Sequence, residues 1–363
     1  MFANKNTFIH VRGALSAITI NSVADLAGVS IKTVSRVLNR EPHVRQETRE
    51  RVLDAAKALR YRPSVSARSL AGSRSYLIVL FFDNPSPAYV ADVQRGAIIR
   101  CRSDGYHLVV EPIDSSAADA DEIVRATLST LRPDGVILTS PVSNRAMVLR
   151  ALDESGVPYV RIAPDVRGGR DDHVWMDEHR AAYELTRHLL ALGHRDIGFI
   201  IGHPDHAASQ LRLDGFLQAM REQGCPTPDH RVAQGQFSFG SGVACAGALL
   251  GGSDRPTAIF ASNDDMALGV LAVAHRLGLS APGDLSVVGF DDTPAASTVS
   301  PRLTTVRQPI FEMAQTAADM LINKDRVRLK QGATPWGLLP FEIVIRESSA
   351  PPRQTFDNAM PAA

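Results

Sequence analysis

The sequence predicts an α/β protein in two parts, a small all-α unit at the N-terminus and a larger core of two α/β lobes. The length of 363 residues exceeds what one hydrophobic core usually holds. From residue 76 onward, strand-length apolar runs alternate with helical patterns. Before that point, over residues 19–60, the apolar residues recur at helical spacing.

Composition excludes several classes of protein. The chain is 44% hydrophobic and 21% charged, which is typical of globular proteins, and no apolar run approaches the roughly 18–20 residues of a membrane-spanning helix. Arg12 and Gly13 interrupt the N-terminal apolar stretch, so it is a poor signal peptide. Cys101, Cys225 and Cys245 are far apart, which disfavours a disulfide framework or a cysteine-based zinc site. These features favour a cytoplasmic protein with no membrane partner.

The net charge of zero conceals an asymmetry along the chain. Residues 1–74 contain 13 Lys and Arg but five Asp and Glu, whereas the remaining residues carry an acidic excess of eight. A basic unit joined to an acidic core is typical of a protein that binds nucleic acid. The alternative is a charged face that is merely solvated.

The basic unit opens with two short helices separated by a sharp turn. Thr19 suits the cap of a first helix that begins near Ile20, Gly28 permits the turn, and Ser30 can cap the second helix. The two helices are expected to pack through Val23, Ala24, Leu26 and Ala27 of the first and Val34, Val37 and Leu38 of the second. The outward residues are then Ile31, Lys32, Ser35 and Arg36. This pattern predicts a helix-turn-helix motif whose second helix lies in a major groove of DNA.

A third helix and a connector follow. Residues 46–60 predict a supporting helix whose apolar stripe is Val52, Leu53, Ala56 and Leu59. Pro63 ends this region, and the segment after it offers a helix too short to be stable alone in water. Leu70 near its end is an apolar side chain on a basic connector. It is interpreted either as a wedge between base steps in the minor groove or as part of an ordinary linker.

Five short motifs occur in order between residues 23 and 70: "VADLAGVS", "TVSRVLN", "V…TRERV", "YRP" and "ARSL". Together they resemble the N-terminal part of the lactose-repressor (LacI) family of bacterial transcription regulators, and the resemblance continues to about residue 348. It implies a homodimer that binds a pseudo-palindromic operator in double-stranded DNA. By this resemblance, the base-reading positions are Ile31, Lys32 and Arg36, and the minor-groove wedge is Leu70. The positions that contact the DNA backbone are Thr19, Ser30, Ser35, Asn39, His43 and Thr48. Thr33 belongs to the same predicted interface.

The rest of the chain independently predicts two lobes. Apolar runs of strand length occur at 76–82, 107–110, 135–140, 158–163, 196–201, 257–262 and 285–290. Helical patterns lie between several of them, over 88–102, 180–192, 209–223 and 264–277. This alternation indicates doubly wound parallel sheets, and it restarts near residue 194. We therefore expect two lobes with a cleft between them, an architecture like that of periplasmic binding proteins.

These patterns predict the boundaries of the parts. The helix-turn-helix domain covers 18–63, a hinge helix or linker covers 64–74, and the effector-binding and dimerisation core covers 75–348. Within the core, one lobe is predicted over 75–176 plus 308–335 and the other over 177–305 plus 336–348. Disordered segments are predicted at the two ends, over 1–17 and 349–363.

Ligands of such sheets lie beyond the carboxyl ends of the strands, where this chain carries polar and aromatic side chains. The candidates are Asp83, Asn84, Ser86, Tyr89, Ser140, His203, His206, Arg212, Phe237, Phe239, Asn263, Asp264, Asp291 and Asp292. Carboxylates and guanidinium groups bind neighbouring hydroxyls, and an aromatic ring covers the apolar face of a sugar. The LacI resemblance implies that Arg212, Phe237, Asn263 and Asp291 are pocket residues and that Tyr89 and His206 lie at its rim. With Asp83 and Ser140 they form the predicted effector site.

Other interpretations apply to single residues. Asp264 and Asp292 suit helix caps, Phe239 suits the hydrophobic core, and an Asp after a strand is often a turn residue. His203 and His206 have the spacing of half a metal site, but no third ligand is evident. We predict no metal and no cofactor. No nucleophile–base set, Gly-x-Ser-x-Gly or phosphate-binding loop stands out, so an enzyme is not expected.

The function predicted from the sequence is therefore sequence-specific DNA binding by a transcriptional regulator. We expect a repressor of carbohydrate-utilisation genes that leaves its operator when a small sugar-like effector binds the cleft. The alternatives are a periplasmic-type sugar-binding protein and a co-repressor-dependent regulator with a nucleobase-like effector. A periplasmic protein would need an export signal and would have no DNA-binding head, so the head favours the regulator.

Overall fold

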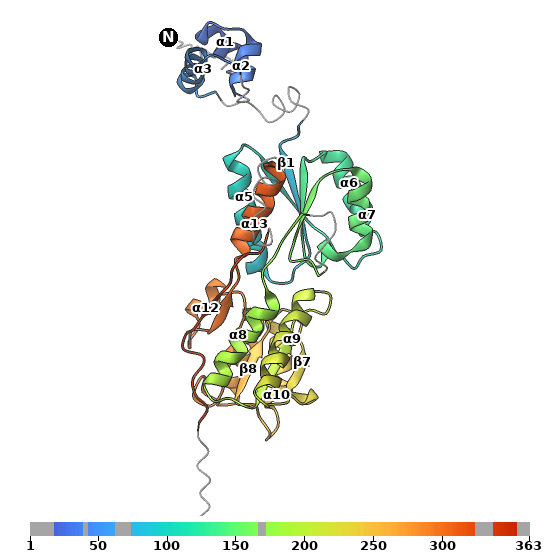
Figure 1. Ribbon diagram of the computed structural model, residues 1–363, viewed down its shortest axis with the longest axis vertical. Helices are drawn as coiled ribbons and strands as arrows, with labels where there is room; N and C mark the ends of the chain where they lie inside the picture. The colour runs from blue at the N-terminus through green and yellow to red at the C-terminus, as the bar shows by residue number, and fades with distance from the viewer. Residues whose placement is uncertain (1–17, 39–42, 62–73, 166–171, 324–336, 354–363) are drawn as a thin grey trace, which may run out of the picture. The chain divides into compact units, whose positions relative to one another are not determined.

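The computed structural model describes residues 18–38, 43–61, 74–165, 172–323 and 337–353 (Figure 1). The chain divides into two compact units, Met1–Ser75 and Tyr76–Ala363, which we call the head and the core unit and describe separately. Several predictions fall outside the described residues: the N-terminal extension, Asn39, Leu70 with most of the hinge segment, and the chain beyond residue 353. None of the helices in the described ranges combines the length and the apolarity that spanning a membrane requires.

Within residues 18–38 and 43–61, the head forms the helices α1 (Ile20–Ala27), α2 (Ile31–Leu38) and α3 (Gln46–Ala58). Gly28 ends α1 in the left-handed conformation at φ +64°, and the Val29 N–H donates to the Ala24 carbonyl at 3.1 Å. A side chain at this φ would strain the turn, so glycine is favoured there. The small shared core consists of Val23, Ala24, Ala27, Val34, Val37, Val52, Ala55 and Ala56.

Two residues assigned to the core of the head are instead exposed. Leu26 is 57% exposed and Leu53 is 48% exposed. Each helix turns by about 100° per residue, so each leucine lies one step away from the buried stripe of its helix. The predictions for Leu26 and Leu53 are therefore wrong, because three short helices bury only a narrow stripe of each.

The first lobe of the core unit is a five-stranded parallel sheet in the order β2-β1-β3-β4-β5. Its strands are β1 (Leu77–Phe82), β2 (His107–Pro112), β3 (Gly135–Thr139), β4 (Tyr159–Ile162) and β5 (Asp172–Val174). Two helices, α5 (Pro87–Ser103) and α13 (Ile310–Ile322), cover one face (Figure 1). The other face is covered by α6 (Ala120–Leu131) and α7 (Ala146–Ser155), with η1 (Val142–Asn144) before α7.

The second lobe is a four-stranded parallel sheet in the order β7-β6-β8-β9. Its strands are β6 (Ile197–Ile201), β7 (Val232–Gln234), β8 (Ala258–Ala261) and β9 (Ser286–Val288). The helices α8 (Glu178–Ala191) and α9 (Ala207–Glu222) pack on one face, and α10 (Phe239–Leu250) and α11 (Asp264–Arg276) pack on the other. The short elements η2 (Asp229–Arg231) and α12 (Pro294–Thr298) complete the lobe.

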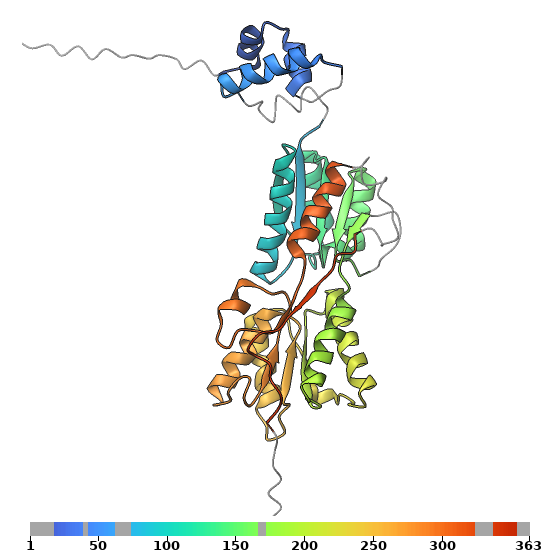
Figure 2. The same ribbon diagram turned by 60° about the vertical axis from the view of Figure 1, so that its left-hand side comes forward.

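Three described segments connect the lobes. The chain leaves the first lobe after β5 and returns between β10 (Thr305–Arg307) and α13. It reaches the second lobe again through β11 (Glu342–Val344), which pairs antiparallel with β10, as the red C-terminal segment in Figure 2 shows. Near this last crossing, the Leu339 N–H donates to the Trp175 carbonyl at 2.9 Å. The described connections between the lobes are therefore the segment after β5, the segment between β10 and α13, and the segment that leads into β11.

The C-terminal residues that the structure describes are packed. His188 Nε2 lies 3.0 Å from Ser349 Oγ, and the buried His194 Nε2 lies 2.9 Å from the Ala350 carbonyl. Residues 349–353 thus belong to the folded core unit rather than to the predicted disordered tail, because buried polar groups of the second lobe bind them.

Close helix packing in the second lobe gives a first prediction. A Cβ at Gly215 in α9 would collide with the His179 carbonyl of α8, whereas a Cβ at the exposed Gly247 in α10 would meet no atom within 4 Å. We expect Gly215→Ala to lower the free energy of unfolding by about 1–3 kcal/mol. Gly247→Ala should raise it by about 0.4–1 kcal/mol, because alanine restricts the unfolded chain. Denaturant unfolding of both variants checks this, and equal effects would contradict a close α8–α9 contact.

Candidate functional site

The outward face of α2 in the head carries the predicted base-reading residues. Ile31 is 49% exposed, and Lys32 and Arg36 are also exposed, because the buried Val34 and Val37 fix the rotation of the helix. An exposed apolar residue beside two cations suits contact with the edges and methyl groups of bases. This surface is what a helix-turn-helix presents to the major groove.

The remaining predicted contacts of the head lie around that surface. The Ser30 side chain caps α2, accepting from the Thr33 N–H at 3.2 Å. Thr19 precedes α1, and its N–H donates to Ser22 Oγ at 3.3 Å. Thr19, Ser30 and His43 are exposed, whereas Thr33, Ser35 and Thr48 are half-buried. The predicted cap of α2 is thus present, Thr19 occupies the N-cap position of α1, and the exposed residues remain accessible to a backbone phosphate.

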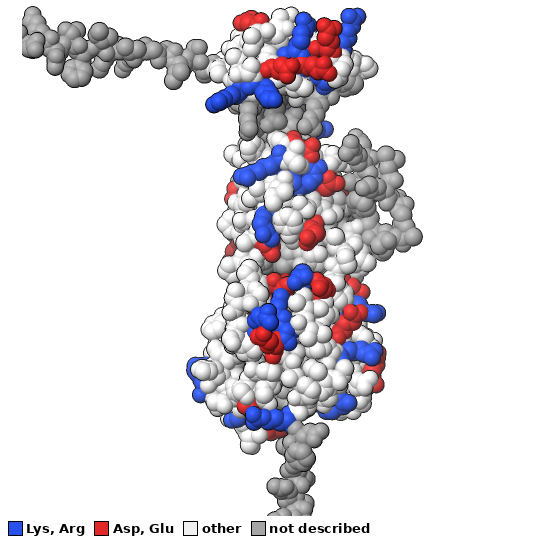
Figure 3. All heavy atoms as spheres, turned by 90° about the vertical axis from the view of Figure 1, so that its left-hand side faces the viewer, with Lys and Arg blue, Asp and Glu red and all other residues white. Residues whose placement is uncertain are grey.

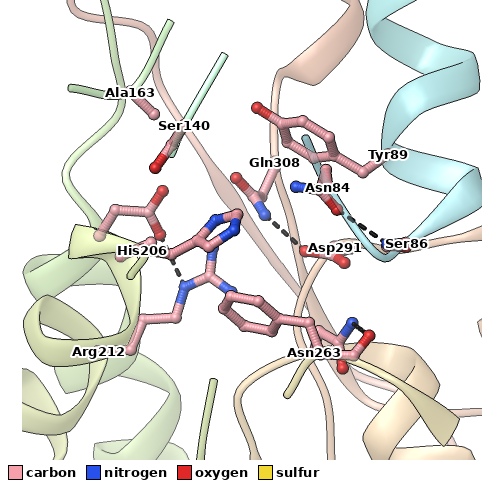
Figure 4. Close-up of a pocket in the computed structure, with 13 residues that line it drawn as sticks. Asn84, Ser86, Tyr89, Ser140, Ala163, His206, Arg212, Asn263, Asp291 and Gln308 are labelled. Atoms are coloured by element: carbon pink, nitrogen blue, oxygen red, sulfur yellow. Dashed lines mark hydrogen bonds and ion pairs between the residues drawn. The ribbon is translucent and has the colours of Figure 1, made fainter. Parts of the chain in front are cut away.

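The core unit holds a pocket of about 440 Å³, including its open mouth, between the two lobes. Figure 4 shows residues of the first lobe facing residues of the second across it. The pocket lies beyond the carboxyl ends of the strands, as expected for parallel sheets. Its lining residues are Asn84, Ser86, Tyr89, Ser140 and Ala163 from the first lobe, Glu178, His206, Ala208, Arg212, Phe237, Asn263 and Asp291 from the second, and Gln308 from the segment after β10.

Every predicted effector residue except Asp83 lies at this pocket. The Asp83 carboxylate instead accepts from the Ser115 N–H at 2.9 Å, so it holds a neighbouring loop. Adjacent residues in an extended segment point to opposite sides, and Asn84 is the one that faces the pocket. The core interpretation of Phe239 is also wrong, because this first residue of α10 is 50% exposed.

A buried ion pair forms one wall of the pocket. Arg212 Nε donates to Glu178 Oε2 at 2.9 Å, and both side chains are 5% exposed. Arg212 also donates to the Ser262 carbonyl, and its guanidinium carbon lies 3.7 Å from the centroid of the Phe290 ring. The partners come from α8, from the end of β8 and from the end of β9, so the guanidinium is held rigidly by its surroundings.

Asp291 forms the facing acidic group, and its backbone is strained. Its φ is +123°, a conformation rare for a residue with a side chain. The Asp291 N–H donates to the Val306 carbonyl at 2.8 Å, and Oδ1 accepts from Gln308 Nε2. Burial raises the pKa of Asp291 well above its usual range, although the nearby Arg212 opposes this. A group held so firmly in an unfavourable conformation is typical of a functional site.

Aromatic rings complete the pocket. The Phe237 ring centroid lies 5.3 Å from that of His206 and 5.7 Å from the Arg212 guanidinium carbon. Gly202 makes room for the Phe237 ring, which would overlap a Cβ at that position. Burial, followed by the nearby His203 and Arg212, lowers the pKa of His206 to about 3, so its imidazole is neutral.

Buried polar residues behind the pocket hold its loops. Asn263 caps α11 through the Met266 N–H at 3.0 Å and donates to the Phe237 carbonyl at 3.0 Å. Asp264 is the first residue of α11 rather than its cap, and accepts from the Thr293 N–H at 2.7 Å. Asp292 is not a cap either, because it pairs with Arg307 at 2.7 Å and with Arg346. Asn263 therefore has a structural role at the edge of the pocket.

Direct contacts between the lobes flank the pocket. Ser86 Oγ donates to Asp265 Oδ2 at 2.9 Å, and Arg145 Nη2 lies 2.8 Å from Asp205 Oδ2. Each contact joins the first lobe to the second and would be lost if the lobes separated. The described residues contain no group of three or more His, Cys, Asp or Glu that could hold a metal ion.

The sequence analysis missed Glu178 and Gln308 as pocket residues. Glu178 follows β5 and Gln308 follows β10, and each of these strands has three residues. Such short strands give no alternating pattern, so the residues after them were not examined as ligands. The Asp177–Glu178 start of α8, where Asp177 Oδ1 accepts from the Arg180 N–H at 3.0 Å, was the signal available for Glu178.

Comparisons with known proteins agree with both units. Residues 19–64 match the model of bacterial regulatory proteins of the lacI family, and residues 186–349 match a periplasmic binding protein-like domain. The HTH-type transcriptional regulator DegA of Bacillus subtilis is 34% identical over 339 residues, which cover 92% of this chain and 98% of DegA. The chain belongs to the lacI family. It is thus a DNA-binding transcriptional regulator, as the LacI resemblance implied, and its relatives are regulators and not enzymes.

Two solved structures of transcriptional regulators are similar over most of the chain. The complex of the transcriptional regulator CelR with cellobiose is 30% identical with a TM-score of 0.68, covering 92% of this chain and 100% of CelR. The lac repressor dimer bound to operator and the anti-inducer ONPF is 28% identical with a TM-score of 0.73, covering 92% of this chain and 99% of that one. The predicted helix-turn-helix unit and two-lobed α/β core are confirmed.

The buried imidazole predicts a pH dependence of stability. His206 has a pKa of about 3 in the folded chain against 6.5 when solvated, so the unfolded chain binds more protons between these values. Stability is therefore lost as the pH falls below 6.5, by about 2 kcal/mol at pH 5. Denaturant unfolding from pH 7 to pH 5 should show a shallower loss for His206→Gln than for the original chain. Replacement of the exposed His275 by Gln serves as the control, and equal pH profiles for His206→Gln and the original chain would refute the assignment.

Proposed function

We propose that this regulator is a repressor of carbohydrate-utilisation genes that leaves its operator when a small sugar binds the pocket. The observation that carries the proposal is the placement of Arg212 and Asp291 around one pocket with the Phe237 ring beside them. Charged groups of both signs bind neighbouring hydroxyls, and a ring packs on the apolar face of a pyranose. The complex of the relative CelR with cellobiose supports a sugar as the ligand class.

The other polar groups of the pocket suit the same ligand. Burial and the nearby Glu178 and Asp291 raise the pKa of Tyr89 above its usual range, so the phenol keeps its proton and can donate. Asn84 and Gln308 offer amide groups, and Ser140 offers a hydroxyl. A ligand with several hydroxyls would satisfy these donors and acceptors together, whereas an apolar ligand would leave them unpaired.

Effector and operator are coupled through the lobes. A ligand in the pocket touches both lobes, so it favours one degree of lobe closure over others. If closure alters how two heads meet DNA, the effects of effector and operator on one another are reciprocal. We infer a homodimer acting in the cytoplasm on a pseudo-palindromic operator, because two heads must reach two half-sites. On the face of the core unit in Figure 3, basic and acidic side chains are interspersed.

The head gives a prediction for base reading. Arg36 projects from the exposed side of α2, where it can donate to guanine O6 and N7. We expect Arg36→Ala to cost about 1–3 kcal/mol of binding to an operator selected from random sequences, and little on unrelated DNA. Fluorescence anisotropy at fixed salt measures both affinities. Lys57→Ala on α3 is the control, and we expect it to change the affinity for both DNAs by the same factor. Equal losses for Arg36→Ala would show that Arg36 contacts only phosphate.

The pocket gives a prediction for release. Asp291→Ala should abolish the sugar-dependent loss of operator binding and leave operator affinity near that of the original chain, because Asp291 belongs to the core unit. The measurement is operator binding across a panel of sugars and nucleobases. Asp214→Ala, on the exposed side of α9, should retain the response. A normal dose–response curve for Asp291→Ala would remove this residue from the site. Tighter operator binding with ligand would indicate a co-repressor instead.

A further inference from the structure

The single guanidinium of the pocket is already neutralised inside the protein. Arg212 donates through Nε to Glu178 and also donates to the Ser262 carbonyl, while Phe290 covers one of its faces. Both charged side chains are 5% exposed, so solvent does not screen the pair. Arg212 therefore reaches a ligand as half of an ion pair and not as a free cation.

The charges of the described lining residues add up to no positive excess. Arg212 is the one cation among them, because the buried His206 is neutral. Glu178 and Asp291 are both carboxylates of the lining. If Asp291 is ionised the sum is negative, and if it holds a proton the sum is zero. Arg161 is also buried and lies two residues before the lining residue Ala163. It is not part of the lining, and it donates to the Ser143 carbonyl at 3.1 Å.

The carboxylate of Glu178 is held by the start of a helix and by the guanidinium of Arg212. Glu178 is the first residue of α8, where the helix dipole favours negative charge, and it accepts a charge-assisted hydrogen bond from Arg212. A ligand anion would have to compete with this internal carboxylate for Arg212 or lie beside it unpaired. Placing an unpaired charge in a buried site is strongly unfavourable. Hydroxyl and ammonium groups meet no such penalty, because the carboxylates accept from them.

We propose that this pocket excludes anionic ligands and selects neutral or amino sugars, and that Glu178 sets this selectivity by occupying Arg212. The inference rests on the proposed function of the pocket as an effector site. It narrows the ligand class to compounds without a carboxylate or phosphate. It also makes Glu178 a specificity residue whose charge, rather than its shape, decides which sugars bind.

The first test compares matched ligands on the original full-length chain by calorimetry. The probes are D-glucose with D-glucuronate and D-glucosamine, and D-galactose with D-galacturonate, because a uronate keeps the pyranose ring of its parent. For any pair that binds, we expect the acid to bind at least tenfold more weakly than the neutral parent. An acid that binds as tightly as its parent, or more tightly, overturns the proposal.

The second test does not require the natural effector. Glu178→Gln frees Arg212, so millimolar sulfate should raise the melting temperature of this variant saturably, compared with chloride at equal ionic strength. The original chain should show no such saturable shift. Glu184→Gln, a neutralisation on the same helix away from the pocket lining, should behave like the original chain. A folded Glu178→Gln protein that gains no sulfate response overturns the role of Glu178. When no sugar of the panel binds the original chain, the proposal is judged on this sulfate test alone.

Loss of the buried ion pair can prevent folding of Glu178→Gln, which circular dichroism would reveal. Asp291→Asn then replaces it, because it removes a lining carboxylate and keeps an acceptor for Gln308. Glu178 still occupies Arg212 in this variant, so we expect no saturable sulfate response from it, and a response would overturn the assignment of the selectivity to Glu178. If a uronate binds the original chain and releases operator, the charge inference fails but the proposed function stands. If no ligand affects operator binding while Glu178→Gln gains the sulfate response, the charge inference stands and the proposed function fails.

Discussion

The arrangement of the second lobe depends on the hydrogen bonds and packing contacts of the buried Arg212 guanidinium. The guanidinium joins α9 to Glu178 at the start of α8, to the Ser262 carbonyl after β8 and to the Phe290 ring after β9. A buried arginine is tolerated only when its donors are satisfied, so these elements must be in place together. The same requirement places the beginning of α8 beside the pocket. Residues that line the pocket are therefore also residues that hold the lobe together.

The pocket stores backbone strain that its surroundings offset. Ala163, Phe237 and Asp291 all line it, and their φ angles are +50°, +56° and +123°. Each such conformation costs on the order of 1–3 kcal/mol and persists only where neighbouring contacts dictate it. Asn263 donates to the Phe237 carbonyl, and Val306 and Gln308 hold Asp291. The backbones of Phe237 and Asp291 are thus held in place by contacts within the protein.

The sequence predicts strands that lie within continuous apolar runs and fails where a strand has no such run. Each of the apolar runs from 76–82 to 285–290 corresponds to a strand, because buried parallel strands are continuous apolar segments. The strands β5 and β10 have three residues each and left no pattern, so Glu178 and Gln308 were missed. Leu26 and Leu53 show the opposite error, since an apolar residue near a buried stripe is not necessarily buried. Which of two adjacent residues faces the pocket, as with Asp83 and Asn84, depends on local backbone geometry.

Among the described residues, the two side-chain contacts that join the lobes beside the pocket are polar, and each contributes little free energy. Arg145 and Asp205 are 33% and 45% exposed, and an ion pair of this kind contributes about 0.2–1 kcal/mol. The Ser86–Asp265 hydrogen bond adds a net stabilisation of about the same size. A ligand that prefers one arrangement by only about 1.4 kcal/mol shifts such an equilibrium tenfold. Gln308 lies on a segment that crosses between the lobes and donates to Asp291 inside the pocket. Asp291 is therefore in direct contact with a segment that connects the lobes.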